Sequence, residues 1–388
     1  MGYGGGSGSG GSGGSGGAGG AGAGGGGYTT VGGGSAFGDP SEFELPSLNQ
    51  APAGSIRFNT DSKKLEVYIL SPVGYGTLPN GIWMEVDSWS PDLLTGGTRG
   101  VISGGFNPGG TNIIDYINIS STGNALDFGD QTAVFRSSGQ CSSSTRGIIA
   151  GGTTVPGGTN RNAIEFITIS STGSAADFNG DLTDGRHNIG AMASSTRGCF
   201  VGGNNPSNVN IIDFVTIASS GDAVDFGDMS NGTDQGMSGC SSATRGVFGA
   251  GTDDTDELNY ITISTQGNST DFGSLVTDTG AHSRGSCSNS IRGLFAGGSS
   301  NSNTIEYITI ATLGDSTDFG DLTTGTRAGM SATSSPTRGC FNGGGNPSAT
   351  NVIDYVQIMS IGNAIDFGDL TLNRSYAYGS ISNGHGGL

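Results

Sequence analysis

Residues 292–310 read R-G-L-F-A-G-G-S-S-N-S-N-T-I-E-Y-I-T-I, and this stretch decides the fold. A short apolar run ends in a diglycine, a polar loop follows, and a second run is rich in β-branched and aromatic residues, as β-strands are. The Arg-Gly that opens the stretch recurs along the chain. The six copies begin at Arg99, Arg146, Arg197, Arg245, Arg292 and Arg338.

The copies define a repeat unit of about 48 residues. Successive arginines are 47, 51, 48, 47 and 46 residues apart. In each unit the aromatic run leads through a turn like S-T-G-N to an Asp-Phe pair, and then to a Ser-rich run. The six pairs begin at Asp127, Asp177, Asp225, Asp271, Asp318 and Asp366. Four strands in this length match a propeller blade, whose apolar faces are buried only by neighbouring blades.

The two ends of the array predict that it closes into a ring. Arg99 has no Ser-rich strand before it, and the Ser-rich run R-S-Y-A-Y-G-S-I-S-N from Arg374 has no arginine strand after it. Pairing these orphans in one blade would remove two exposed sheet edges. We therefore predict an all-β chain with a six-bladed β-propeller over residues 97–388, closed by its C-terminal strand. A β-solenoid is the rival, although its coils usually repeat at shorter periods.

The apolar run ending in Gly-Gly, followed by an aromatic strand, resembles the kelch repeat. No tryptophan occurs in the repeats, so the Tyr and Trp pair usual in kelch is only half present. Galactose-oxidase-type enzymes also use kelch-like propellers, and their copper needs paired histidines and tyrosines on one face. Here the only histidines are His187, His282 and His385. We therefore expect a kelch-like architecture without catalytic residues, cofactor or metal.

Two segments precede the propeller. Residues 1–35 are almost all Gly, Ser and Ala, which predicts a flexible tether. The alternative is that several copies pack as polyglycine-type extended helices, which would make the protein a homo-oligomer. Residues 36–96 contain G-S-I-R-F-N-T-D-S-K-K-L-E-V-Y from Gly54 and G-I-W-M-E-V from Gly81.

The second segment predicts a small β-hairpin module. Apolar residues alternate with polar ones around a turn, namely Ile56, Phe58, Leu65 and Val67. We expect Trp83, on a third strand, to cover this apolar face. The arrangement looks like a small "G-x-I-R-F-N-T … L-E-x-Y … W" module found in tail-fibre and other virion proteins of tailed phages, and an unrelated hairpin is the alternative.

The amino-acid composition and net charge exclude some classes of binding partner. The 388 residues include 77 glycines and only 12% charged residues, so turn formers outnumber helix formers. The formal net charge is −18, which repels a phosphate backbone, so we expect no nucleic-acid partner. No window approaches the ~20 apolar residues of a membrane span, and no N-terminal secretion signal is visible.

The five cysteines occupy equivalent places in the repeats. Cys141, Cys240 and Cys287 lie five residues before a repeat arginine, and Cys199 and Cys340 lie two residues after one. The odd count and equivalent placement favour small buried strand residues over disulfides.

Repetition of the arginines indicates a structural role, because a brace between blades is needed in every repeat. We expect each of the six to pair with an aspartate of an Asp-Phe motif in the same or an adjacent blade. Five more arginines follow the Asp-Phe pairs, at Arg136, Arg186, Arg284, Arg327 and Arg374. Ca²⁺ held by clustered aspartates is the alternative to arginine pairing and solvated turns. The D-F-G in five copies lacks the H-R-D loop that accompanies it in protein kinases.

Asparagine-rich loops offer a hint of binding. Asn side chains both donate and accept hydrogen bonds, which suits sugar hydroxyls, although Asn-Pro and Asn-Gly also simply make good turns. The candidate glycan-binding residues are Asn107, Asn112, Asn204, Asn205, Asn208, Asn346 and Asn351.

The whole pattern looks like virion structural or tail-fibre-like proteins of marine and cyanobacterial tailed phages. The resemblance rests on the Gly-rich leader, the I-R-F-N-T hairpin and repeats of the form T-R-G … A-G-G … D-F-G-D-L. It implies a non-enzymatic virion protein that contacts other virion proteins through residues 1–96 and host-surface polysaccharide through an outward-facing propeller. A purely architectural virion component and a bacterial cell-surface adhesin are the alternatives.

Overall fold

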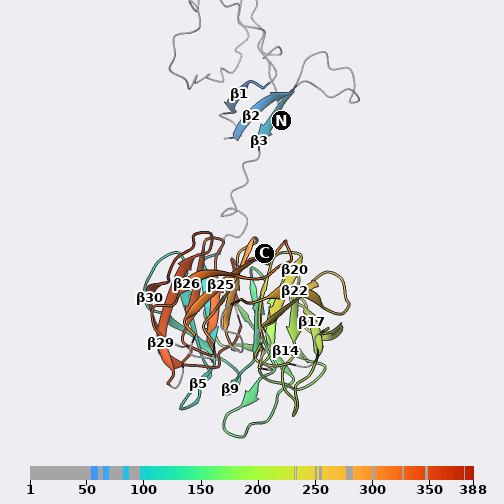
Figure 1. The fold of residues 1–388 in the computed structure, drawn as a ribbon, viewed down its shortest axis with the longest axis vertical. Coiled ribbons are helices and arrows are strands. Elements are labelled where there is room, and N and C mark those ends of the chain that lie inside the picture. Colours follow the sequence, from blue (N-terminus) through green and yellow to red (C-terminus); the bar gives the residue numbers. More distant parts are fainter. Residues whose placement is uncertain are drawn as a thin grey trace, which may run out of the picture. The chain divides into compact units, whose positions relative to one another are not determined.

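The computed structural model describes residues 54–59, 64–69, 82–86 and 97–388, the last range without 231, 233, 250, 253–255, 277–282, 299–301, 326, 346–347 and 380. The chain divides into two units, Met1–Trp89 and Ser90–Leu388 (Figure 1). The described part consists of strands and turns, and it offers no helix that could cross a membrane. The Gly-rich segment 1–35 and the predictions made for it lie outside the described residues.

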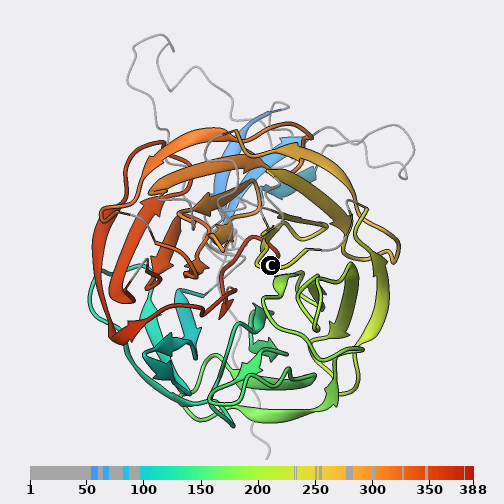
Figure 2. The ribbon, with the colours of Figure 1, turned by 60° about the horizontal axis from the view of Figure 1, so that its bottom comes forward.

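Six four-stranded antiparallel sheets surround a central axis as the blades of a β-propeller (Figure 2). From the axis outward, blade 1 contains β31 (Ile381–Ser382), β4 (Arg99–Ser103), β7 (Ile113–Asn118) and β8 (Leu126–Asp130). Blade 2 contains β10 (Gly139–Ser142), β11 (Arg146–Ala150), β13 (Ala163–Thr168) and β14 (Ala176–Asp181). Blade 3 contains β15 (Gly190–Ala193), β16 (Arg197–Val201), β17 (Ile211–Thr216) and β18 (Val224–Asp228).

The remaining three blades follow the same order. Blade 4 contains β19 (Ser238–Ser241), β20 (Arg245–Gly249), β21 (Glu257–Thr262) and β22 (Thr270–Ser274). Blade 5 contains β23 (Gly285–Ser288), β24 (Arg292–Ala296), β25 (Thr304–Thr309) and β26 (Thr317–Asp321). Blade 6 contains β27 (Ser331–Ser334), β28 (Arg338–Asn342), β29 (Thr350–Gln357) and β30 (Ile365–Arg374). Two short ribbons pair β5 (Phe106–Asn107) with β6 (Gly109–Gly110), and β9 (Phe135–Arg136) with β12 (Thr153–Thr154).

The propeller has two faces, and each face carries a different set of connections between strands. The chain enters β4 at Arg99 on the side that also carries the tight turns after the first and third strands of each blade, and we call this side the turn face. Because neighbouring strands are antiparallel, the connections after the second and fourth strands lie on the opposite side, which we call the loop face. In blade 1 these connections are residues 104–112 and 131–138.

The predicted closure of the ring is confirmed. β31 pairs with β4, with Ile381 opposite Val101 and Ser382 opposite Gly100. The Arg99 N–H also donates to Asn383 Oδ1 at 2.9 Å. The first blade therefore takes its innermost strand from the end of the chain, and the β-solenoid alternative is wrong.

The residues after β31 fill the axis at the turn face (Figure 2). His385 is buried, and its Nε2 lies 2.6 Å from the Ser142 carbonyl while its Nδ1 accepts from Gly387 N–H at 3.0 Å. The Gly386 N–H donates to the Ser288 carbonyl at 2.9 Å. Beside His385 the axis keeps a cavity of about 20 Å³, which is room for a single water molecule.

Glycines on the second and the outermost strand of each blade allow close contact with a neighbouring blade. A Cβ added to Gly198 of the Arg-Gly motif would lie 2.6 Å from Cys141 Sγ of the preceding blade, so this glycine makes room for that side chain. At the outer rim, a Cβ on Gly129 of D-F-G would lie 2.5 Å from the Gly173 backbone of the next blade. All five cysteines are buried and unpaired, as predicted.

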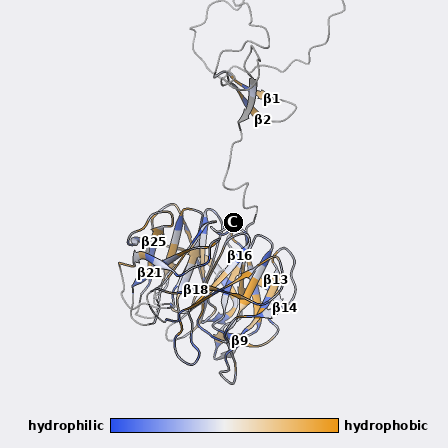
Figure 3. Cartoon of the chain, turned by 90° about the vertical axis from the view of Figure 1, so that its right-hand side faces the viewer, coloured by the Kyte–Doolittle hydropathy of each residue, from blue (hydrophilic) through white to orange (hydrophobic). Residues whose placement is uncertain are grey.

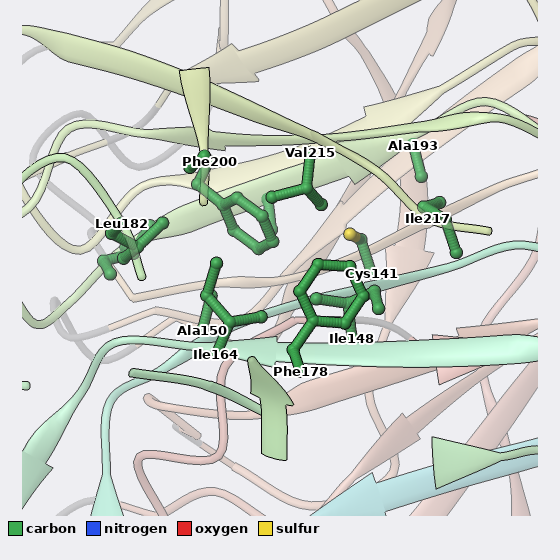
Figure 4. Packing of buried hydrophobic residues seen from close by; sticks show 13 residues of the cluster. Cys141, Ile148, Ala150, Ile164, Phe178, Leu182, Ala193, Phe200, Val215 and Ile217 are labelled. Atoms are coloured by element: carbon green, nitrogen blue, oxygen red, sulfur yellow. The ribbon is translucent and has the colours of Figure 1, made fainter. Parts of the chain in front are cut away.

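Separate hydrophobic clusters lie between successive blades, and the hydrophobic residues follow the strands (Figure 3). Figure 4 shows the cluster between blades 2 and 3, where Ile148 and Phe178 of one blade face Phe200 and Val215 of the other. The Phe of each Asp-Phe pair meets the aromatic residue of the third strand edge to face, as Phe178 meets Phe166 at 6.3 Å. A single blade could not bury these side chains alone.

The N-terminal module is a three-stranded antiparallel sheet of β1 (Ile56–Asn59), β2 (Lys64–Ile69) and β3 (Ile82–Val86), as the hairpin prediction requires. The predicted buried face is wrong. Ile56, Phe58 and Leu65 are 64%, 49% and 44% exposed, whereas Trp83 packs on Tyr68 of the other face. The reason is register, because Tyr68 lies directly opposite Trp83 and side chains alternate between the faces.

Closure of the ring can be tested with two isoleucines. Ile381 of β31 is 0% exposed, and Ile361 on a turn of blade 6 is 60% exposed. We expect Ile381→Ala to lower the free energy of unfolding by about 2–5 kcal/mol, because it leaves a cavity in the closing blade. Ile361→Ala should change it by less than about 0.5 kcal/mol. Urea denaturation compares the two, and equal effects would contradict a stabilising closure.

The buried His385 predicts a dependence of stability on pH. Burial lowers its pKa to about 4 from 6.5, so the folded protein keeps the ring neutral while the unfolded chain takes up a proton. Stability from this residue is therefore complete above about pH 6.5 and is lost as the pH falls toward 4.

The control is His385→Gln, which keeps an N–H donor and does not titrate. Melting temperatures between pH 7 and 4 should fall less steeply for the variant than for the natural protein. Parallel profiles would show that His385 does not respond to acid.

Candidate functional site on the loop face

The six repeat arginines brace each blade against the next one. Arg197 lies 4.5 Å from the ring centroid of Phe214 in its own blade, and its Nη1 donates to the Ile263 carbonyl of the next blade at 3.1 Å. The other pairs are Arg99 with Ile169, Arg146 with Ile217, Arg245 with Ile310, Arg292 with Ile358 and Arg338 with Ile119. Arg338 reaches from blade 6 to blade 1 and so completes the ring of contacts.

The predicted pairing of these arginines with the Asp-Phe aspartates is wrong. Within the described residues none of the six arginines forms an ion pair. The aspartates concerned, Asp127, Asp177, Asp225, Asp271, Asp318 and Asp366, are exposed on the outermost strands. Side chains alternate along a strand, so burying each Phe turns the preceding Asp outward. Asp225 Oδ1, for example, accepts from the Gly227 N–H at 3.2 Å.

Buried carboxylates on the third strands take the other arginines as partners. These four ion pairs join a blade to its predecessor and are Arg186–Asp213, Arg284–Glu306, Arg327–Asp354 and Arg374–Asp115. In the Arg327–Asp354 pair the two atoms lie 3.0 Å apart, and both side chains are at most 2% exposed. Thr323 of the earlier blade also donates its N–H and hydroxyl to Asp354. Burial lowers the pKa of Arg327, and the charge of Asp354 opposes that shift.

The two remaining junctions depart from this rule. Into blade 4 the carboxylate is replaced by Asn259, which accepts from the Ser230 hydroxyl at 2.8 Å and needs no cation. At blade 2, Glu165 pairs with Arg161 of the same blade at 2.8 Å. Arg136, which occupies the position of the other pairing arginines, is thereby left without its carboxylate.

Arg136 has a different environment on the loop face. Its guanidinium carbon lies 4.8 Å from the ring centroid of Phe106 and 5.2 Å from that of Tyr376. All twelve arginines of the propeller are described, and Arg136 is the one whose side chain makes no hydrogen bond or ion pair. Its Nε is buried. His187 lies nearby, and its pKa is lowered by burial first and by the Arg136 charge second.

A closed ring of main-chain hydrogen bonds holds this cluster beside the axis. A residue with positive φ lies two positions before five of the innermost strands and five positions before β31. These residues are Ser137, Asn188, Gly236, Ser283, Gly329 and Tyr376. The N–H of each donates to the carbonyl of the preceding member, except that Ala377 N–H closes the last step to Gly329. Tyrosine rarely adopts positive φ, so Tyr376 (φ 56°) is strained and still 39% exposed.

Three of the candidate glycan-binding asparagines are brought together, but they bind one another and their neighbours. Asn204 donates its amide to Asn208 Oδ1 at 2.9 Å, and Asn205 donates to Asp184 Oδ1 at 2.8 Å. Asn160 of blade 2 donates to Asn205 Oδ1 at 3.2 Å and bonds His187 Nδ1 at 2.8 Å. This network fixes the loops of blades 2 and 3 to each other, as turn-forming asparagines do.

Of the other four candidates, the three that the structure describes do not join that network. Asn107 is exposed on β5, and Asn112 and Asn351 are half-buried in blades 1 and 6. Asn346 lies outside the described residues. The six described candidates therefore do not form one site.

The site residues that sequence reasoning missed are Phe106 and Tyr376. Both break the repeat, because the residue after the diglycine is Thr153 in blade 2 and Asn204 in blade 3, and the positive-φ residues elsewhere are small or polar. Departure from the repeat was the available signal.

No protein-family model matches this chain, and no curated protein matches it significantly. Within the described ranges, no three His, Cys, Asp or Glu side chains lie together as a metal site.

Two aspartates of blade 6 provide a matched test of the ion pairs. Asp354 is buried against Arg327, whereas Asp366 is exposed. We expect Asp354→Asn to lower the free energy of unfolding by about 3–5 kcal/mol, because it leaves a buried guanidinium without a counter-charge. Asp366→Asn should change it by less than about 0.5 kcal/mol. Thermal and urea unfolding measure both, and a small effect of Asp354→Asn would show that the buried pair contributes little.

Proposed function

We propose that this chain is a structural component of a phage particle that presents its propeller to the host surface. The observation that carries the proposal is the polarity of the propeller. The chain enters on the turn face, and the irregular Asn-rich and aromatic loops lie on the opposite loop face. An attachment segment upstream of residue 97 would thus hold the turn face toward the particle and leave the loop face toward the host.

The N-terminal module supports attachment to other virion proteins. The exposed side of its sheet carries Ile56, Phe58 and Leu65, and side chains of this size are usually covered in a working assembly. Binding partners through residues 1–96 are therefore part of the proposal, together with the resemblance of the I-R-F-N-T hairpin to phage modules.

The charged residues that recur in the blades stabilise the propeller, which supports its proposed role as a rigid scaffold that presents loops to the host. Its repeat arginines and buried carboxylates hold the blades together, and such a rigid ring positions loops accurately. The loops of blades 1, 2 and 3 around Arg136 contain the aromatic and cationic groups that a saccharide would meet.

Antibody fragments can test which face meets the host. We expect a fragment raised against loop 106–112 to block adsorption of particles to host cells, and a fragment against turn 359–363 to leave adsorption unchanged. Mass spectrometry of purified particles should find the chain in a fixed ratio to the major structural proteins. Its absence from particles would refute the proposal, and presence with unblocked adsorption would leave a purely architectural role.

A further inference from the structure

We propose that Arg136, Phe106 and Tyr376 form a binding site for the carboxylate of an acidic saccharide on the loop face. This inference deepens the proposed function by naming the ligand class, and it rests on that function only for its biological setting. The site itself follows from a break in the symmetry of the ring.

The Arg136 guanidinium is free to bind a ligand. Every other propeller arginine is satisfied by a carbonyl or a carboxylate, as Arg197 is by Ile263 and Arg374 by Asp115. Arg136 lost its expected partner because Arg161 already neutralises Glu165. Its Nη1 and Nη2 donors therefore remain for an external acceptor, and a planar carboxylate matches both at once.

Two aromatic rings beside the Arg136 guanidinium offer a surface on which a sugar can pack. Phe106 and Tyr376 meet edge to face at 6.4 Å, and Arg136 lies over both. A pyranose ring has an apolar face of C–H groups that packs on such rings, while its hydroxyls bond to polar neighbours. Phe106 is held at the site by two main-chain hydrogen bonds to Ser375, of 2.8 and 3.1 Å, so the rings are positioned before a ligand arrives.

Charge selects the ligand class. The chain carries a net charge of −18, so a polyanion would be repelled unless several cations faced it. The site has one cation, which suits one isolated carboxylate on a sugar. Nucleic acids and polyphosphates are therefore poor ligands, and uronic-acid sugars are good ones.

Calorimetry on the full chain can test the site with an acidic trimer made of two galactoses and a single galacturonate and, for comparison, a neutral galactose trimer. We expect the acidic trimer to bind and the neutral one to bind at least about tenfold more weakly. Arg136→Gln should remove that preference, and Arg136→Lys should weaken acidic binding by a smaller factor, because lysine cannot form the bidentate contact. Tyr376→Asn should also weaken binding while tolerating the positive φ.

The control variant is Asp318→Asn on the exposed outer strand, which should bind like the natural protein. The Arg136 side chain has no polar partner that its removal would leave unsatisfied. We therefore expect its variants to have the same melting temperature as the natural protein. Equal binding of both trimers, no binding of either, or unchanged binding by Arg136→Gln would overturn the inference. Inorganic phosphate that competes as well as the trimer would show a general anion site instead.

The outcomes separate this inference from the proposed function. If particles that carry Arg136→Gln adsorb normally, the proposal of a host-facing propeller stands, whereas an acidic saccharide as its ligand on the host is refuted. Binding of the trimer by a chain that is absent from particles would do the reverse.

Discussion

The fold depends on burying carboxylates that most blades cannot neutralise by themselves. Asp213 and Asp354 lie in the centre of third strands, fully covered, and each requires an arginine from the preceding blade. A buried charge without a partner costs several kcal/mol of stability. These pairs therefore stabilise the correct contact between blades, and a misplaced blade would leave a charge unpaired. The repeat arginines also reach from each blade to the following one, and they do so from the start of the second strand. Four of the six junctions are therefore held by a buried ion pair as well as by a repeat arginine.

Glycine completes this specification by shape. The glycines of Arg-Gly and of D-F-G have a neighbouring blade within contact of the missing Cβ, so they set how closely two blades approach. In blade 2 the D-F-G triplet becomes D-F-N, with Asn179 in a left-handed conformation that asparagine tolerates. The glycine contact then moves to Gly180, which meets Gly221 of blade 3.

The sequence predicted the fold well because the repeat is visible at each level. The period, the orphan strands at the two ends and the buried cysteines follow from one unit read six times. The choice of ion-pair partners could not be predicted in the same way. Asp127 and Asp115 both lie close to aromatic residues in the sequence, and only strand register and the twist between blades decide which of them is covered. The reading of Ile56 and Phe58 as a buried stripe failed for the same reason, since a one-residue change of register exchanges the two faces of a sheet.

The strand that completes blade 1 also has a consequence for synthesis of the chain. Arg99 and Asn383 touch although 284 residues separate them. While the polypeptide is still being made on the ribosome, β4 has no inner neighbour and its backbone groups remain open to pairing with another nascent chain. Loop closure over so long a span is slow, so the final step of maturation must wait for translation of the last strand. A cell that makes this protein in quantity would therefore need to shield that strand edge until synthesis is finished.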